Sequence, residues 1–135
     1  MALILDTSAL IELERSIERP EPPPFLNEEP VIIPAIVWAE ALIGARLASS
    51  AVIAARRRAH LEAIRRQIEI APFTPEIAEH YADIYSELSV TGSLIPQNDI
   101  AVAATCRFFC GTLLVGPNDE AHFCRVHELD VKAIS

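Results

Sequence analysis

"MALILDTSALIELE" (residues 1–14) begins with a short apolar run that ends at a carboxylate. Residues 2–5 are all apolar and predict a buried strand, and Asp6 stands where that strand should end. A run of helical character follows from Ser8. Asp6 therefore has two interpretations: it caps the helix, or it brings a functional carboxylate to the end of a core strand.

Short apolar runs alternate with longer segments of helical periodicity along the whole chain. Strands are predicted at 2–5, 31–33, 68–71, 112–115 and 130–134. Helices are predicted at 8–16, 35–48, 51–67, 75–91 and 96–109. Strands separated by helices predict an α/β fold with a parallel sheet covered on both faces. At this length, residues 1–135 are expected to form one domain, in which the proline-rich stretch 18–30 is a surface loop.

Composition limits the classes of protein to which the chain can belong. A net charge of −8 argues against a protein that coats nucleic acid, which would be basic. The apolar share of 51% predicts that some surface is covered by a partner. No basic segment with a cleavage site precedes the first strand, and no uncharged run is long enough to span a membrane. We therefore expect a cytoplasmic protein with reduced thiols.

Two further patterns have ordinary structural explanations. Cys106, Cys110, Cys124 and His127 contain the ligand types of a zinc site, but their spacing matches no common zinc module. Residues 56–66 contain five arginines, whose spacing from neighbouring glutamates predicts i,i+4 ion pairs that stabilise a helix. A basic patch that binds a phosphate backbone is the alternative.

Glu40 lies in the apolar segment "IVWAEALIGARL" (residues 36–47). Its spacing from Ile36, Ile43 and Leu47 predicts that all four share the buried face of a helix. A charged carboxylate on such a face is unfavourable unless a cation or hydrogen bonds compensate. The simpler alternatives are a neutral glutamate in the core and a helix rotated slightly so that Glu40 is exposed.

Asp99 and Asp119 are the other acids in unexpected surroundings. Pro96 predicts a helix start, which places Asp99 in the first turn on a face shared with apolar residues. The helix dipole alone would favour an acid there. Asn118, Asp119 and Glu120 follow a strand and a Gly-Pro turn, and any of the three could cap a helix. Because the carboxyl ends of parallel strands meet at one edge of a sheet, we expect Asp6, Glu40, Asp99 and Asp119 to gather there. Such a cluster repels itself unless a cation binds, and oxygen ligands favour Mg²⁺ or Mn²⁺.

Four stretches resemble the PIN domain, and in particular the VapC toxins of VapBC toxin–antitoxin pairs. These stretches are "LILDTSALIEL" (3–13), "IPAIVWAEALIGA" (33–45), "IPQNDIAVAAT" (95–105) and "LLVGPNDEAHFCRV" (113–126). The fourth departs from the family pattern, in which a Thr often closes the strand and an Asp or Asn follows. Counting back from His122 and Phe123 favours Asp119 as the matching acid, with Asn118 as its competitor.

The resemblance implies a three-layer α/β/α fold, a homodimer, and an endoribonuclease that depends on Mg²⁺ or Mn²⁺ and is inhibited by a VapB antitoxin. By matching position, the metal-binding and catalytic residues would be Asp6, Glu40, Asp99 and Asp119, and Thr7 or Ser8 would help to orient a metal-bound water. The metal would activate that water and neutralise the leaving oxygen of an RNA phosphodiester. A catalytically silent module that acts only through its antitoxin is the alternative.

Overall fold

Strands from distant parts of the chain form one parallel sheet. The computed structural model describes residues 1–22 and 29–134, and within them the sheet has five strands in the order β3-β2-β1-β4-β5. The strands are β1 (Leu3–Leu5), β2 (Val31–Pro34), β3 (Glu69–Ala71), β4 (Thr112–Val115) and β5 (Asp130–Ala133). All four neighbouring pairs are parallel. In β1, Leu3 is in register with Val31 on one side and Thr112 on the other.

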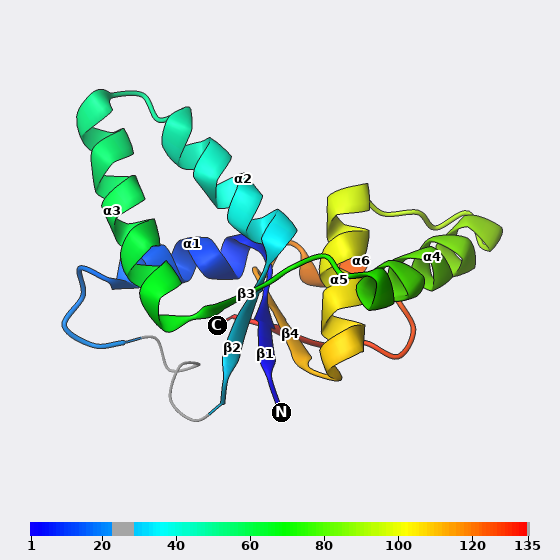
Figure 1. Cartoon of the computed structure of the whole chain (residues 1–135). Helices are drawn as coiled ribbons and strands as arrows, with labels where there is room; N and C mark the ends of the chain where they lie inside the picture. Colours follow the sequence, from blue (N-terminus) through cyan, green and yellow to red (C-terminus); the bar gives the residue numbers. More distant parts are fainter. Residues whose placement is uncertain (23–28, 135) are drawn as a thin grey trace.

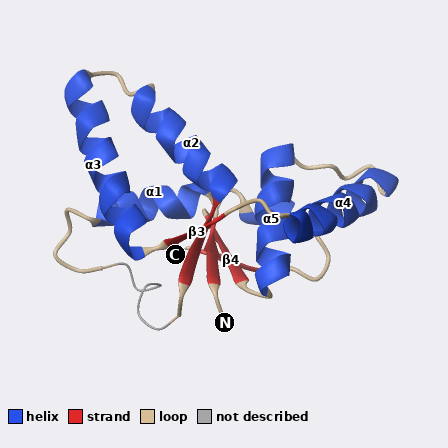
Figure 2. Ribbon diagram, viewed as in Figure 1, coloured by secondary structure: helices blue, strands red, loops and turns tan. Residues whose placement is uncertain are grey.

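Helices cover both faces of this sheet (Figures 1 and 2). They are α1 (Thr7–Ser16), α2 (Ala35–Arg46), α3 (Ala51–Gln67), α4 (Pro75–Val90), α5 (Gln97–Phe109) and α6 (Glu120–Phe123). Helix α1 packs on β1 and β4, while α5 packs on β1, β2 and β4 and is covered by α4. Figure 1 shows α2 and α3 as a hairpin that extends from the sheet on the side of α1. This arrangement confirms the three-layer α/β/α fold with a central parallel sheet.

The central strands are almost wholly apolar because both faces of the sheet are buried. Ile4 and Leu5 of β1 and Leu113 of β4 have no solvent exposure, because helices cover both faces of the sheet. Strands buried on both faces do not alternate between apolar and polar residues. The predicted strands and long helices agree with the structure to within one or two residues at each end. Of the predicted loop 18–30, residues 23–28 lie outside the described part of the chain.

The predicted buried face of α2 is wrong. The face that packs inward carries Val37, Trp38, Ala41 and Ala45, all less than 10% exposed. Ile43 and Leu47 are 54% and 78% exposed, and Ile36 and Glu40 are half-buried. Nearly every residue of this helix is apolar, so several stripes at helical spacing fit the sequence and the periodicity does not select one.

An ion pair joins the α2–α3 hairpin to α1. The guanidinium of Arg57 donates through Nε to Oε1 of Glu14 at 2.9 Å and through Nη2 to Oε2 at 3.2 Å. It also lies against α2, since a β-carbon on Gly44 would be 3.0 Å from Nη1. Among the described residues the ion pairs do not include the i,i+4 pairs expected inside α3. This arginine therefore supports the packing of three helices rather than one helix alone.

The cysteines do not assemble a metal site in the described chain. Cys106 is buried, and its thiol lies 3.3 Å from the carbonyl of Gly111. Cys110 and Cys124 are exposed and unpaired. No helix of the described residues is long and apolar enough to cross a membrane.

Candidate active site

Asp6 both caps a helix and faces other carboxylates. Its Oδ1 accepts the backbone N–H of Ala9 at 2.8 Å, which makes it the N-cap of α1. The side chain is nonetheless buried, at 4% exposure. Burial raises the pKa of Asp6 to about 7, and the charges of Asp119 and Asp99 add to the increase, while the amides of Ala9 and Gly116 oppose it. The structure thus shows Asp6 as a helix cap, and it also brings Asp6 near two other acids.

Glu40 and Asp99 reach the same edge of the sheet from two other helices. Glu40 lies in the second turn of α2, directly after β2, and burial followed by the charge of Asp99 raises its pKa, with Thr7 opposing the increase. Asp99 lies in the first turn of α5. Burial raises the pKa of Asp99 and Asp119 adds to the increase, whereas His122 lowers it. The predicted apolar neighbours of Asp99 (Val102, Ala103 and Cys106) are all buried.

Asp119 is the acid delivered by the fourth strand. Its Oδ2 accepts the hydroxyl of Ser8 at 2.8 Å, which ties the loop after β4 to the first turn of α1. Asn118 is exposed, and no hydrogen bond joins it to the other site residues in the described chain. The structure therefore places Asp119 rather than Asn118 toward the acids.

Gly116 makes room for this bond between Ser8 and Asp119. A β-carbon at Gly116 would lie 2.7 Å from Cβ of Ser8, 3.0 Å from its Oγ and 3.7 Å from Oδ2 of Asp119. No side chain fits at the first of these distances without movement of α1 or the loop. Gly116 lies in the region where the family pattern often has a threonine. Its lack of a side chain thus allows α1 to approach the loop closely enough for Ser8 to bind Asp119.

Gly116→Ala is therefore expected to destabilise the protein by roughly 1–3 kcal/mol, because the added methyl group overpacks the start of α1. Ser8→Ala keeps the β-carbon and loses only the hydrogen bond, at about 1 kcal/mol. Urea unfolding of both variants measures the two effects. In a Ser8→Gly background the alanine at 116 should destabilise much less. An equal loss in both backgrounds would contradict the steric explanation.

His122 is the site residue that reasoning from the sequence missed. Its Nε2 lies 3.0 Å from Oδ2 of Asp99, although the ring N–H is not directed along a good hydrogen bond. It stands in the one-turn helix α6, which the sequence did not predict because four residues carry too little periodicity. The spacing of His122 could have indicated its place, because residues three apart lie on the same face of a helix and His122 follows Asp119 by three.

The four predicted acids thus come to one edge of the sheet, but they do not form a ready-made cage. Asp6, Asp99 and Asp119 interact through their charges, and Glu40 interacts with Asp99. Within residues 1–22 and 29–134, no three acidic, histidine or cysteine side chains converge closely enough to hold an ion. An ion held directly by three of these side chains would require some of them to turn.

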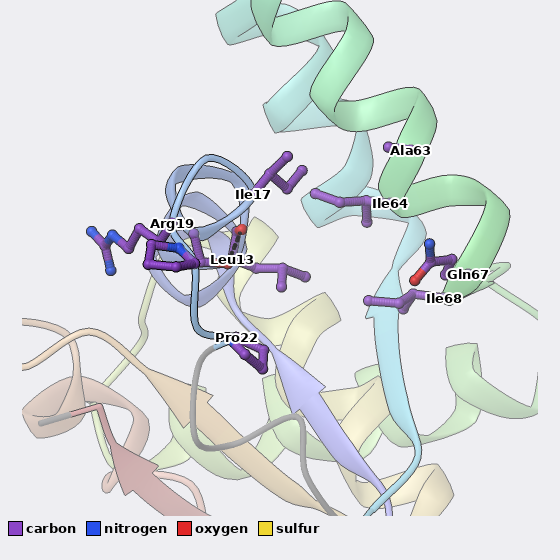
Figure 3. Close-up of a pocket in the computed structure, with 10 residues that line it drawn as sticks. Leu13, Ile17, Arg19, Pro22, Ala63, Ile64, Gln67 and Ile68 are labelled. Atoms are coloured by element: carbon purple, nitrogen blue, oxygen red, sulfur yellow. Dashed lines mark hydrogen bonds between the residues drawn. The ribbon is translucent and has the colours of Figure 1, made fainter.

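The pocket drawn in Figure 3 lacks this chemistry. It measures about 340 Å³ and lies between the carboxyl-terminal ends of α1 and α3, where apolar side chains such as Ile17, Ile64 and Ile68 line it. It contains no carboxylate, and Pro22 on its rim is the last described residue before the gap. We therefore place the candidate site at the acidic edge and not in this pocket.

Comparison with known proteins agrees with the fold, a three-layer α/β/α arrangement around a parallel sheet. The model of the PIN domain family matches residues 3–129, and the chain belongs to this family. Members of this family are generally nucleases. A search of curated protein sequences finds none that matches.

Solved structures of toxin–antitoxin complexes share the fold. A chain of VapBC2 from Rickettsia felis, bound to a promoter DNA fragment, is 20% identical with a TM-score of 0.83 and full coverage of both chains. A chain of DNA-bound VapBC from Salmonella typhimurium is 19% identical (TM-score 0.82), and one of VapBC-5 from Mycobacterium tuberculosis is 23% identical (TM-score 0.76). In both, 98% of each chain is covered.

Proposed function

We propose that this chain is the toxin of a type II toxin–antitoxin pair of the VapBC kind and acts as a Mg²⁺- or Mn²⁺-dependent endoribonuclease. The observation that carries the proposal is the meeting of carboxylates from separate elements at the carboxyl edge of the sheet. Asp6 follows β1, Asp119 follows β4, and Asp99 begins α5, and burial with mutual repulsion raises the pKa values of Asp6 and Asp99. Carboxylates held together in this way are typical of functional sites.

The chemistry of these residues fits a hard divalent cation. All four predicted ligands offer oxygen atoms, which suit Mg²⁺ and Mn²⁺ better than zinc. The raised pKa of Asp6 supports this fit, because a bound cation would offset the burial and repulsion that oppose its charge. We expect Asp6, Glu40, Asp99 and Asp119 to hold the ion.

The protein's own residues position the reacting groups. When bound, the metal would activate a water molecule and stabilise charge on the phosphodiester. Ser8 keeps Asp119 turned toward the site through its 2.8 Å hydrogen bond. Asp6 caps α1 by accepting the backbone N–H of Ala9, and this hydrogen bond holds its carboxylate in place. A carboxylate of this set would accept the proton from the attacking water.

The surface beside Glu40 and Asp99 suits unpaired bases. A pocket of about 410 Å³ there is lined by residues that flank both acids in sequence, including Ala39 and Asn98, and by the rings of Phe73 and Tyr81. These two rings meet edge to face with centroids 6.0 Å apart, and Phe73 is 53% exposed. Exposed aromatic rings stack with bases and side-chain amides bond to base edges, which supports single-stranded or looped RNA as substrate.

The α2–α3 hairpin supports the proposal of an antitoxin partner. Ile43, Leu47 and Val52 near its tip are more than half exposed, so burial by an apolar segment of a partner would be favourable. An arginine or lysine of the antitoxin would be attracted by the nearby carboxylates. We also propose a homodimer, and light scattering that shows a stable monomer at micromolar concentration would contradict it.

Pulsed expression followed by mapping of cut sites in total RNA tests the proposed activity. The wild-type chain should arrest growth and produce new RNA ends at defined positions. A catalytically silent module that acts through its antitoxin would produce no new ends. RNA without new ends while the chain is expressed and folded would therefore favour that alternative.

Asp119→Asn and Asn118→Asp distinguish the two candidates for the fourth acid. Because Asp119 interacts with Asp6 and Asp99 whereas Asn118 is exposed, the first substitution should reduce RNA cleavage roughly 100-fold and the second should change it little. Single-turnover cleavage rates measure both. A larger loss from the change at 118 would assign the fourth position to that residue instead.

A further inference from the structure

His122 is held against Asp99 by the same short helix that follows Asp119. Its Nε2 lies 3.0 Å from Oδ2 of Asp99 and is shielded from solvent, while the whole side chain is 26% exposed. The next residue, Phe123, is 1% exposed and anchors α6 in the core. The two rings lie with centroids 4.8 Å apart. The imidazole therefore has a fixed backbone and a defined place beside one of the acids.

The imidazole contacts one carboxylate oxygen of Asp99 and favours the charged form of this acid. Asp119 raises the pKa of Asp99, and His122 acts in the opposite direction on the same carboxyl group. A cation bound at Asp99 would do the same. His122 thus lies against Oδ2 of Asp99, an oxygen that a bound ion would use.

The contact is close and lowers the pKa of Asp99, but it is poorly aligned as a hydrogen bond. A histidine that orients a metal-binding carboxylate from behind donates a well-directed N–H, but here the ring N–H is not aligned with the oxygen. In addition, no three ligands converge among the described residues, so an ion held by three of these side chains would need a rearrangement. The His122 side chain is 26% exposed, whereas Phe123 beside it is buried.

We infer that His122 and a divalent cation compete for Asp99, so that the imidazole must leave Oδ2 before the ion can bind. The inference rests on the proposed metal site. It assigns His122 the role of a residue that sets the metal affinity of this chain: the side chain stabilises the metal-free site and weakens the binding of the ion.

Calorimetric titration of the full chain with Mn²⁺ tests the competition. His122→Ala should bind Mn²⁺ roughly 3- to 10-fold more tightly than the wild type. The contact between His122 and Asp99 would stabilise only the metal-free protein, so its loss would favour the metal-bound one. His127→Ala is the matched control: this histidine is exposed and its backbone carbonyl, which accepts from Arg107, is retained. The control should bind Mn²⁺ as the wild type does. Thermal unfolding followed by circular dichroism shows that each variant is folded.

The other outcomes separate this inference from the proposed function. Unchanged affinity in His122→Ala overturns the competition, and weaker binding overturns it in favour of a ligand or orienting role. In either case, weaker Mn²⁺ binding by Asp99→Asn would still support the proposal that Asp99 belongs to a metal site. If folded wild-type and variant proteins all fail to bind Mn²⁺, the proposed metal site fails, and the competition fails with it. A second readout is the ring signal of His122 in the NMR spectrum, which should shift as Mg²⁺ is added.

Discussion

Asp99→Asn is expected to reduce RNA cleavage roughly 100-fold or more, because it removes one charge from the metal site and keeps the size of the side chain. The fold should persist. The loss of an acid from the first turn of α5 costs only about 0.3–1 kcal/mol, and relief of repulsion with Asp119 offsets it. Cleavage rates at saturating Mg²⁺ and thermal unfolding measure the two effects separately.

Asp83→Asn is the control for this substitution. Asp83 is an exposed acid on α4, and no shift in the pKa values of the site residues involves it. Its variant should cleave as the wild type does. Wild-type cleavage by the Asp99 variant would remove this residue from the mechanism, whereas equal losses in both variants would indicate a general effect of net charge on RNA binding.

Asp6→Asn is expected to stabilise the metal-free protein above neutral pH. The pKa of Asp6 is raised to about 7 in the folded chain from 3.8, so the folded state retains a proton that the unfolded state has lost between these values. The contribution of Asp6 to stability is thus fully present below about pH 4 and is lost as the pH rises to about 7. In EDTA, wild-type unfolding free energy should fall over this range.

The asparagine variant should lack most of this decline and be more stable at pH 8 by on the order of 3 kcal/mol. It keeps an oxygen that accepts the Ala9 amide, because asparagine caps helices about as well as aspartate. The raised pKa values of Glu40 and Asp99 should leave a smaller dependence of the unfolding free energy on pH in both proteins. Urea unfolding in EDTA at several pH values is the measurement. A variant less stable than wild type at pH 8 would show that capping outweighs burial and repulsion.

The sequence predicts the layers and the four acids for a simple reason. The central strands are buried on both faces and stand out as short apolar runs, and an acid directly after such a run, as at Asp6, is placed by the strand itself. Parallel order then brings the strand ends together. The common location of the acids at one edge of the sheet could therefore be predicted from the sequence, whereas the distances between them could not.

The features that the sequence could not predict depend on packing between distant elements. Helix α2 is apolar on nearly all sides, so its orientation is set by contact with α1, α3 and α5 rather than by its own pattern. The Glu14–Arg57 pair spans 43 residues and replaces the local pairs that the spacing in α3 suggests. His122 reaches Asp99 from the short helix α6, which follows β4 and packs on β5.

The metal dependence of RNA cleavage by the purified wild-type chain tests the central claim most directly. Total RNA is incubated with the chain in EDTA, and Mg²⁺ or Mn²⁺ is then added in excess. Four carboxylates that act through a bound ion predict no cleavage in EDTA and full recovery at the same cut positions after either ion is added. Cleavage that continues undiminished in EDTA would contradict a metal site formed by Asp6, Glu40, Asp99 and Asp119.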